Sequence, residues 1–460
     1  MSHSKLSSKL YQERYRPQFH FSAREGWLND PNGLVYHQGE YHLFFQHNPF
    51  GNEWGHMTWG HAVSQDLLHW EQLEHALEPD ETGMMFSGSA VVDWRNSAGL
   101  QTGDAPSLIL AYTAAGSFVT KGLPFTQCLA YSNDRGRSWT KYQGNPVIGD
   151  IAVETRDPKI IWHEASQRWV MALFIDEPHH FALYASNDLK DWHHLQNLDI
   201  PGTRECPDFF PITVDGSGEE KWIYIGADGK YLIGDFDGQR FAPESDLLSL
   251  DYARAFYACQ TFSDIPQEDG RRIQIAWLRE GSYPDMPFSQ HMNFPCELSL
   301  KSTPQGLRLY RWPIAEIERL YQKSDVESVA VDNAEHHHKL TSSGLLDIEL
   351  ELNTQGLQQL DINIHNISCH FDAEERRFSC LDHQVVLEED SPELHIRLLV
   401  DQGSLEVFLN GGRYCLSYCH LMEMSDGLSF TIRGKAQIEC LAVHELRSSW
   451  PVDDHHHYRI

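Results

Sequence analysis

A short pattern that returns three times constrains the fold more than any other feature of the chain. Ser64-Gln-Asp-Leu-Leu-His-Trp70 is echoed by Ser186-Asn-Asp-Leu-Lys-Asp-Trp192, and a third copy, Ser132-Asn-Asp-Arg-Gly-Arg-Ser-Trp139, carries one extra residue. The copies lie roughly 55–70 residues apart, the length of a four-stranded sheet with its turns, so the repeat favours a β-propeller with one blade per unit. We expect the Asp to cap a turn between two outer strands and the Trp to pack between blades.

The first part of the chain, to about residue 310, has short β-rich runs and little helical periodicity. The runs are bounded by Gly, Pro, Asn or Asp, which is typical of strands joined by turns. No alternation of strands with helices is visible, so a doubly wound fold is disfavoured. The clearest runs are Gly33–Tyr36, Tyr41–Phe45, Ser107–Tyr112, Trp169–Phe174, Trp222–Ile225 and Ile273–Trp277.

A second all-β region follows a short helix. Ile314, Ile317 and Leu320 would share one face of a helix that runs from about Ile314 to Lys323. Beyond it, apolar and polar residues alternate as in half-buried strands, which favours a sandwich of antiparallel sheets. The clearest of these strands are Leu345–Leu352, Leu394–Val400 and Leu405–Leu409. We therefore divide the chain into a propeller at 1–312, a helical linker at 313–325 and a β-sandwich at 326–460.

Charge and composition exclude several classes of partner. The chain has 36 Lys and Arg against 66 Asp and Glu, a formal net charge of −30, which argues against nucleic acid and fits a neutral substrate. No 18-residue apolar run is present, so no membrane span is expected. The polar segment Met1–Arg16 lacks the apolar core of a signal peptide, and the nine cysteines include no CxxC pair. We therefore expect buried reduced thiols and a cytoplasmic protein.

Three acidic residues stand in unusual local settings. Asp30 lies in Trp27-Leu-Asn-Asp-Pro-Asn-Gly33, Asp157 in Glu154-Thr-Arg-Asp-Pro158, and Glu205 in Arg204-Glu-Cys-Pro-Asp208. One such segment alone is most often a simple turn. Three of them fall on successive expected blades, and the innermost strands of all blades converge on one axial funnel. Glycoside hydrolysis needs this arrangement, with one carboxylate to attack and one carboxylic acid to protonate the leaving oxygen.

Aromatic residues accompany the three acidic segments. A single aromatic residue is more often part of a core, but a concentration of rings beside carboxylates favours sugar binding, because sugars have apolar faces that stack on rings. The residues concerned are Trp27, Trp54, Trp59, Phe86, Tyr257 and Trp277.

With these motifs the chain resembles glycoside hydrolase family 32, the invertase, levanase and inulinase family, from about Tyr15 to Leu446. Trp27–Gly33 is similar to the nucleophile motif of that family. Phe86-Ser-Gly-Ser89, Arg156-Asp-Pro158 and Glu205-Cys206 resemble its other signatures, in the expected order. The resemblance implies a five-bladed propeller followed by a β-sandwich.

The resemblance also implies the role of each site residue. Asp30 would attack the anomeric C2 of fructose, Glu205 would act as general acid and base, and Asp157 would bind fructose hydroxyls and stabilise the transition state. No metal or organic cofactor is implied. The implied substrate-binding residues, with Tyr257 counted among them for its ring, are Asn29, Gln46, Trp54, Phe86, Ser87, Arg156, Tyr257 and Trp277.

The expected function is that of a retaining exo-acting β-fructofuranosidase, active on sucrose and fructo-oligosaccharides, with inulin and levan as further candidates. Trp54-Gly-His-Met-Thr-Trp-Gly60 resembles the levanase version of its motif more than that of sucrose-6-phosphate hydrolases. The stretch Leu278–Phe288 departs from the family pattern. A fructosyltransferase and a sucrose-6-phosphate hydrolase remain alternatives, as does a carbohydrate-binding protein with an inactive propeller. No sequence feature decides whether the protein forms a homodimer.

Overall fold

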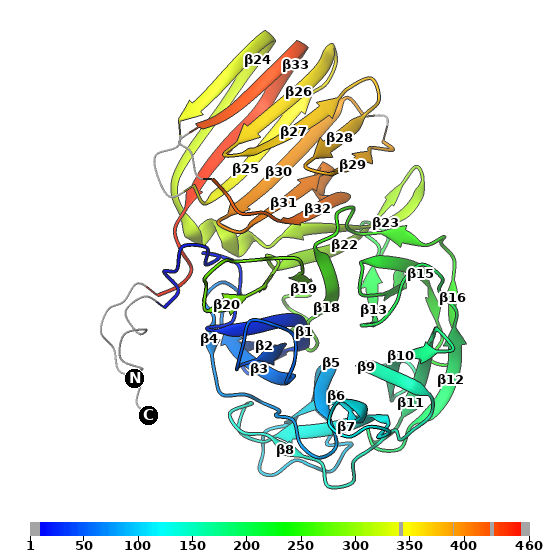
Figure 1. Cartoon of the computed structure of the whole chain (residues 1–460). Coiled ribbons are helices and arrows are strands. Elements are labelled where there is room, and N and C mark those ends of the chain that lie inside the picture. The colour runs from blue at the N-terminus through cyan, green and yellow to red at the C-terminus, as the bar shows by residue number, and fades with distance from the viewer. Residues whose placement is uncertain (1–9, 340–343, 390, 424–426, 452–460) are drawn as a thin grey trace, which may run out of the picture.

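A computed structural model describes residues 10–339, 344–389, 391–423 and 427–451 of the chain. Five antiparallel sheets stand around a common axis as the blades of a propeller, and a larger sheet forms a second body beside them (Figure 1). The expected all-β fold, a five-bladed propeller followed by a β-sandwich, is confirmed. Among the described residues, no helix has the length and apolar character that a membrane span requires.

The first three blades follow the order of the sequence, with the strand nearest the axis first. Blade I contains β1 (Gly26–His37), β2 (Glu40–Asn48), β3 (Thr58–Ser64) and β4 (Glu71–Gln72). Blade II contains β5 (Met84–Asp93), β6 (Ser107–Ala115), β7 (Phe125–Ser132) and β8 (Thr140–Lys141), with the 3-10 helix η2 (Gly116–Phe118) between β6 and β7. Blade III contains β9 (Val153–His163), β10 (Arg168–Glu177), β11 (His180–Ser186) and β12 (His193–Leu198).

The last two blades close the ring. Blade IV contains β13 (Asp208–Thr213), β14 (Glu220–Ile225), β15 (Lys230–Phe236), β16 (Phe241–Pro243) and β17 (Leu248–Ser249). Blade V contains β18 (Phe256–Thr261), β19 (Arg272–Leu278), β21 (His291–Met292), β22 (Cys296–Thr303) and β23 (Gly306–Pro313). Between β19 and β21, the short strand β20 (Phe288–Ser289) leaves blade V and pairs in parallel with β1 of blade I, which joins the last blade to the first.

The three repeats form the turns between the third and fourth strands of blades I, II and III. In each copy the Asp carboxylate accepts two backbone N–H bonds from residues two to four positions later, and the Trp indole N–H donates to the carbonyl three positions earlier. Trp139 of blade II also packs against Phe44 of blade I, with ring centroids 5.4 Å apart. The structural role expected for the repeat is therefore confirmed in its turns, and at Trp139 also between blades.

The linker between the two bodies is shorter than the sequence suggested. The 3-10 helix η3 (Ala315–Leu320) buries Ile317 and Leu320, but it ends at Leu320, because Tyr321 already pairs with Leu446 in the next sheet. Residues 321–325, expected in the linker, are thus the start of a strand. The exact division into domains stays a prediction.

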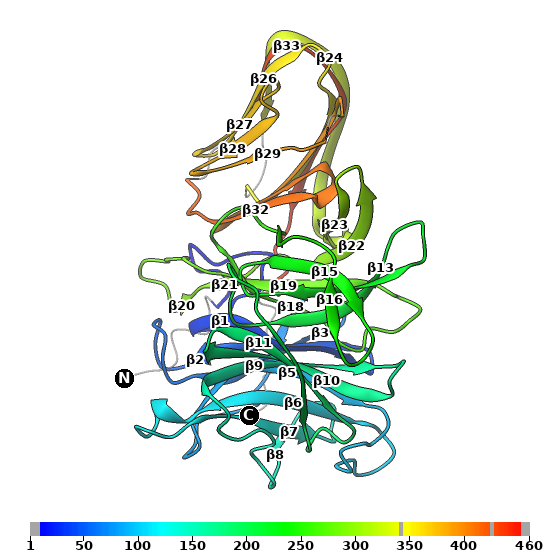
Figure 2. The same cartoon turned by 90° about the vertical axis from the view of Figure 1, so that its right-hand side faces the viewer.

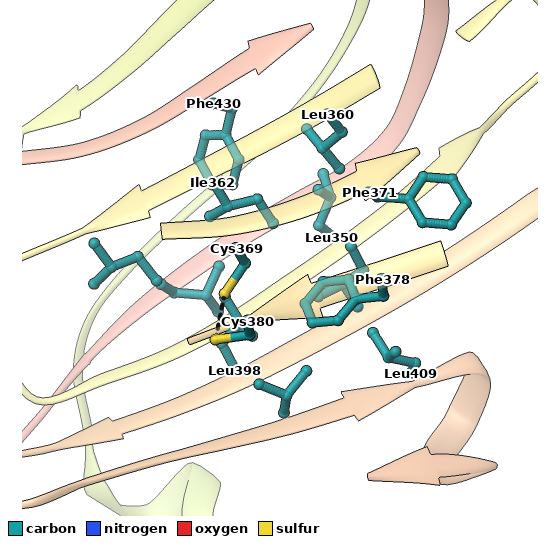
Figure 3. Packing of buried hydrophobic residues seen from close by; sticks show 14 of the residues in the cluster. Leu350, Leu360, Ile362, Cys369, Phe371, Phe378, Cys380, Leu398, Leu409 and Phe430 are labelled. Atoms are coloured by element: carbon teal, nitrogen blue, oxygen red, sulfur yellow. Dashed lines mark hydrogen bonds between the residues drawn. The ribbon is translucent and has the colours of Figure 1, made fainter. Parts of the chain in front are cut away.

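The C-terminal body is one ten-stranded sheet that curls over on itself around its own core (Figure 2). On β25 the alternation expected from the sequence holds, since Ile348 and Leu350 are buried against this core. Cys369 and Cys380 face each other across two paired strands, with their sulfur atoms 3.1 Å apart (Figure 3). The ten strands of the C-terminal sheet are β24 (Tyr321–Lys339), β25 (Leu346–Asn353), β26 (Leu357–Ile364), β27 (Ile367–Asp372), β28 (Arg377–Cys380), β29 (His383–Val386), β30 (Glu393–Asp401), β31 (Ser404–Leu409), β32 (Tyr414–Cys419) and β33 (Gly427–Leu446). The short 3-10 helix η4 (Asn410–Gly412) follows β31.

Buried charges join the two bodies. The His20 ring lies between the carboxylates of Asp401 and Glu406, with nitrogen–oxygen distances of 2.8 and 2.9 Å. Burial by itself lowers the pKa of His20, but the bonds to both carboxylates outweigh this and raise the pKa to about 9. The imidazole is therefore charged at neutral pH, and one cation from the N-terminal segment bonds two carboxylates of the sandwich.

The N-terminal segment is also held by residues that follow the sandwich. Tyr11 and Trp450 stack with ring centroids 4.0 Å apart, and the Trp450 indole N–H donates to the carbonyl of Pro17 at 2.7 Å. The Ser449 N–H donates to the carbonyl of Gln18 at 2.8 Å. The start and the end of the described chain thus form one packed seam.

Candidate active site

The strands nearest the axis are irregular where they reach the funnel. On β1, Leu28 pairs with His47 and Pro31 with Phe45, so two residues, Asn29 and Asp30, stand opposite a single one. Similar shifts of register occur on β5 at Ser87 and on β9 at Asp157. A β-bulge bends a strand and turns a side chain out of the regular alternation. The bulges therefore place these polar side chains in the funnel.

One cavity of about 300 Å³ gathers every site residue predicted from the sequence. It is lined by Asn29, Asp30, Gln46, Trp54, Phe86, Ser87, Phe118, Glu154, Arg156, Asp157, Glu205, Tyr257 and Trp277. The convergence of the three carboxylates, which come from blade I, blade III and the segment before blade IV, is thus observed. The chemical role of each residue stays a prediction at this point.

Asp30 is held by hydrogen-bond donors on both of its oxygens. Ser87 donates to Oδ2 at 2.6 Å, and Asn29 donates to Oδ1 at 3.0 Å. The Cys206 thiol lies 3.5 Å from Oδ2. Burial raises the pKa of Asp30 and the nearby Glu205 raises it further, while these three donors lower it. The donors also fix the direction in which the carboxylate points.

Glu205 is held from two sides at the cavity wall. Arg156 donates to Oε2 from Nη2 at 3.0 Å and from Nε at 3.3 Å. The Tyr257 hydroxyl, from blade V, donates to Oε1. The Glu205 backbone has φ +35°, in the left-handed region that residues with a Cβ rarely adopt. Such strain is typical of functional positions, where the surrounding structure enforces it.

Asp157 is the most enclosed of the three carboxylates that converge in the cavity. Burial raises its pKa to about 7, with contributions from Glu205 and Asp30 that the adjacent Arg156 opposes. Its Oδ2 accepts the Cys206 N–H at 2.9 Å, and its own N–H donates to Thr113 at 3.1 Å. Its φ is +64°, again left-handed. The cavity therefore contains, beside the other two carboxyl groups, one whose pKa is raised toward neutrality.

Aromatic rings form the remaining walls. The Trp277 indole donates to Gln290 at 3.3 Å and packs edge-on against Tyr257, with centroids 6.1 Å apart. Trp54 packs edge-on against Phe86 at 6.0 Å. Trp59, which the sequence grouped with these rings, instead lies fully buried and donates its indole N–H to the carbonyl of Phe86 at 3.0 Å. It supports the wall from behind and does not line the cavity.

Three residues of the site were not assigned a role from the sequence. Phe118 and Glu154 line the cavity, and Cys206 bonds Asp30 and Asp157 beneath it. Glu154 and Cys206 lie inside the motifs that contain Asp157 and Glu205, so these motifs were the sequence signal that could have identified them. Phe118 stands in a segment without any recognisable motif, and no local signal marked it.

A propeller whose axial pocket combines paired carboxylates with a wall of aromatic rings has the arrangement of a glycoside hydrolase. The sequence itself supports this class. Residues 20–313 match the glycosyl hydrolases family 32 N-terminal domain, and residues 316–445 match the glycosyl hydrolases family 32 C terminal. The chain therefore belongs to glycosyl hydrolase family 32, as its motifs had indicated.

Known relatives resemble the chain over nearly its whole length. A levanase of Bacillus subtilis (strain 168) is 35% identical over 494 residues, which cover 96% of this chain and 72% of the levanase. The crystal structure of an exo-inulinase from Aspergillus awamori matches with a TM-score of 0.86 and 27% identity, over 96% of this chain and 100% of that one. A fructofuranosidase from Schwanniomyces occidentalis, solved in complex with fructose, matches with a TM-score of 0.81 and 25% identity, over 96% and 100% of the two chains.

Proposed function

We propose that the protein is a retaining, exo-acting β-fructofuranosidase that releases terminal fructose from sucrose, fructo-oligosaccharides and fructans. The observation that carries the proposal is the meeting of Asp30, Asp157 and Glu205 in one cavity, each with its own set of hydrogen-bond partners. The names of the relatives, a levanase, an exo-inulinase and a fructofuranosidase, support fructosides as the substrate class.

In the first step, an oxygen of Asp30 bonds to C2 of fructose while the bond from C2 to the leaving oxygen breaks. Glu205 gives its proton to that oxygen, so the leaving sugar departs with a hydroxyl group. In the second step, Glu205 takes a proton from water, the water oxygen bonds to C2, and Asp30 is released. Two inversions at C2 retain the configuration. Asp157 holds fructose hydroxyls beside the charge that develops on the ring.

The partners of Asp30 suit a nucleophile. Ser87 and Asn29 donate hydrogen bonds to its two oxygens, so they favour the ionised form that attacks. Arg156 and Tyr257 hold Glu205 in the direction of the same cavity. Separate roles for two carboxyl groups follow from these separate surroundings.

The charges of the cavity favour a neutral sugar over a phosphorylated one. Within the described residues, Arg156 is the one cationic side chain that lines the cavity, and it is already bonded to Glu205. A phosphate group placed among the lining residues would add negative charge beside four carboxyl groups, where the one lining cation is already paired. We therefore expect sucrose-6-phosphate to be a poorer substrate than sucrose.

The test compares three variants on two substrates. Asp30→Ala should lose activity on both sucrose and β-fructofuranosyl fluoride, because both reactions need the nucleophile. Glu205→Ala should lose sucrose hydrolysis but keep the first step on the fluoride, because fluoride leaves without a proton. Glu53→Gln, an exposed acid in the loop that carries Trp54, serves as the matched control and should keep full activity.

Azide identifies the acid and the stereochemistry together. Added to the Glu205→Ala variant with the fluoride, azide should yield β-fructosyl azide, which NMR identifies by its retained configuration. An α-configured product, or an Asp30→Ala variant that keeps sucrose hydrolysis, would contradict the proposed roles. The cytoplasmic location and the oligomeric state stay predictions, for cell fractionation and light scattering to test.

A further inference from the structure

The mouth of the cavity carries an aromatic ring that lies outside the motifs identified in the sequence. Phe118 lies at the end of η2, in the connection between β6 and β7, and it is one of the lining residues. Its ring contacts Phe86 with centroids 5.1 Å apart and Trp54 with centroids 5.4 Å apart. The three rings together form a continuous apolar wall on one side of the cavity.

The connection that carries Phe118 is tightly held. The Gly116 N–H donates to the carbonyl of Pro124 at 3.2 Å, and a Cβ at Gly116 would lie only 2.5 Å from the same oxygen. The Phe118 ring also packs against Phe125 with centroids 6.1 Å apart. The loop is therefore fixed from both sides, and its ring is presented to the cavity without further folding.

Exposure separates the floor of the cavity from its mouth. Phe118 is 45% exposed and Trp54 is 46% exposed. Five of the polar lining residues are nearly covered, at 7% for Asn29, 2% for Gln46, 6% for Ser87, 8% for Arg156 and 6% for Asp157, whereas Asp30 and Glu205 are half-buried and Glu154 is exposed. A fructose unit bound to the covered polar groups would leave the two exposed rings in contact with whatever extends outward from it.

We propose that Phe118 is a specificity-determining residue, the platform on which the leaving sugar stacks while Glu205 protonates the bond between the two sugars. This inference rests on the proposed function. The leaving sugar begins at the oxygen that Glu205 reaches and continues toward the mouth, where the flat apolar rings of Phe118 and Trp54 remain exposed. A sugar ring has an apolar face of C–H bonds that such a surface can cover. Phe118 thereby favours substrates whose leaving group is a sugar.

The experiment compares substrates with and without a leaving sugar. In β-fructofuranosyl fluoride the leaving group is a single ion, whereas sucrose and 1-kestose release a sugar. Phe118→Ala should lower kcat/KM for sucrose and 1-kestose roughly tenfold, as expected for losing the contact of one ring face, and should leave kcat/KM for the fluoride within about twofold. Phe118→Tyr keeps the flat ring and should retain the sucrose activity of the unmodified protein.

Val119→Ala is the matched control, since Val119 follows in the same loop, is 40% exposed and does not line the cavity. Val119→Ala should leave kcat/KM unchanged for all three substrates. An equal loss on the fluoride would show that Phe118 only supports the pocket, and an unchanged kcat/KM for sucrose would show that it touches no leaving sugar; either result overturns the inference. Failure of the unmodified protein on all three substrates would instead reject the proposed function.

Discussion

The hydrogen bond from Ser87 to Asp30 provides the sharpest test of how the site is tuned. At 2.6 Å, with a carboxylate as acceptor, it is a short bond to a charged group in a covered pocket. Ser87→Ala removes this donor and one contact with the Asn32 amide at 3.1 Å, while Asn29 and Cys206 still contact Asp30. The variant therefore isolates one contribution to the ionisation and the placement of the nucleophile.

The size of the effect follows from the energy of such a bond. A hydrogen bond to a charged group contributes about 1.5–3 kcal/mol, and each 1.36 kcal/mol is a factor of ten in rate, so kcat/KM should fall about 10- to 150-fold. Burial raises the pKa of Asp30, whereas the Ser87 bond lowers it. Without that bond the pKa rises further, and the acid limb of the pH profile moves to higher pH.

The assay is the pH dependence of kcat/KM for sucrose, measured for the unmodified protein, Ser87→Ala and Ser107→Ala. Ser107 is an equally buried serine on the next strand, and its hydroxyl donates to Asn133 at 2.8 Å, with no carboxylate involved. The control should follow the profile of the unmodified protein. The reasoning is refuted if Ser87→Ala folds normally yet its acid limb stays in place or moves to lower pH, or if kcat/KM falls by less than about threefold.

Three further outcomes follow from the same structure. His20→Gln should lower the free energy of unfolding at pH 7 by about 3–5 kcal/mol, because two buried carboxylates lose their cation. In the unmodified protein this stabilisation is complete below about pH 6.5 and should disappear as the pH rises through 9. Urea unfolding between pH 7 and 10 should show this loss of stability in the unmodified protein and not in His20→Gln. Asp157→Asn should raise the melting temperature more at pH 8 than at pH 4. Folding raises the pKa of Asp157 from 3.8 to about 7, so its ionisation costs stability at pH 8 but hardly at pH 4. An equal effect at both pH values would contradict this. Gly88→Ala should lower both the melting temperature and kcat/KM, because the new Cβ would lie 1.9 Å from a carbonyl oxygen of β6 and would push Ser87 away from the nucleophile. Gly149→Ala is the control: Gly149 has open space around it, so this substitution should change neither quantity.

The parts of the fold that depend on local bonding could be predicted from the sequence. The repeated Asp and Trp make their defining hydrogen bonds within the same turn, so their spacing alone reveals the turn and the blade. The site residues were found for a related reason. Asp30, Asp157 and Glu205 stand in short motifs with Pro or Cys beside them, and propeller geometry brings such motifs to one axis.

Features that depend on contacts between distant segments could not be predicted. Trp54 and Trp59 stand in one motif, yet the first lies in a loop at the cavity mouth and the second faces the interior from β3. Phe118 lines the cavity only because its loop folds back against Pro124. The bond from Tyr257 of blade V reaches Glu205 in the segment before blade IV, and the helix after the propeller ends early because Tyr321 pairs with Leu446. Apart from the Phe118 loop, whose partner Pro124 is near in sequence, the decisive partner is remote in each case.

The seam between Tyr11 and Trp450 ties the order of synthesis to the order of assembly. The ribosome releases blade I before any of its later neighbours exist, but Trp450, the aromatic partner that covers Tyr11, is made only after the strands of the sandwich. The same holds for Asp401, which receives the backbone N–H groups of Gln18 and Phe19. The flank of the first blade therefore stays uncovered until the sandwich has been translated. The nascent propeller depends on that domain to complete its packing.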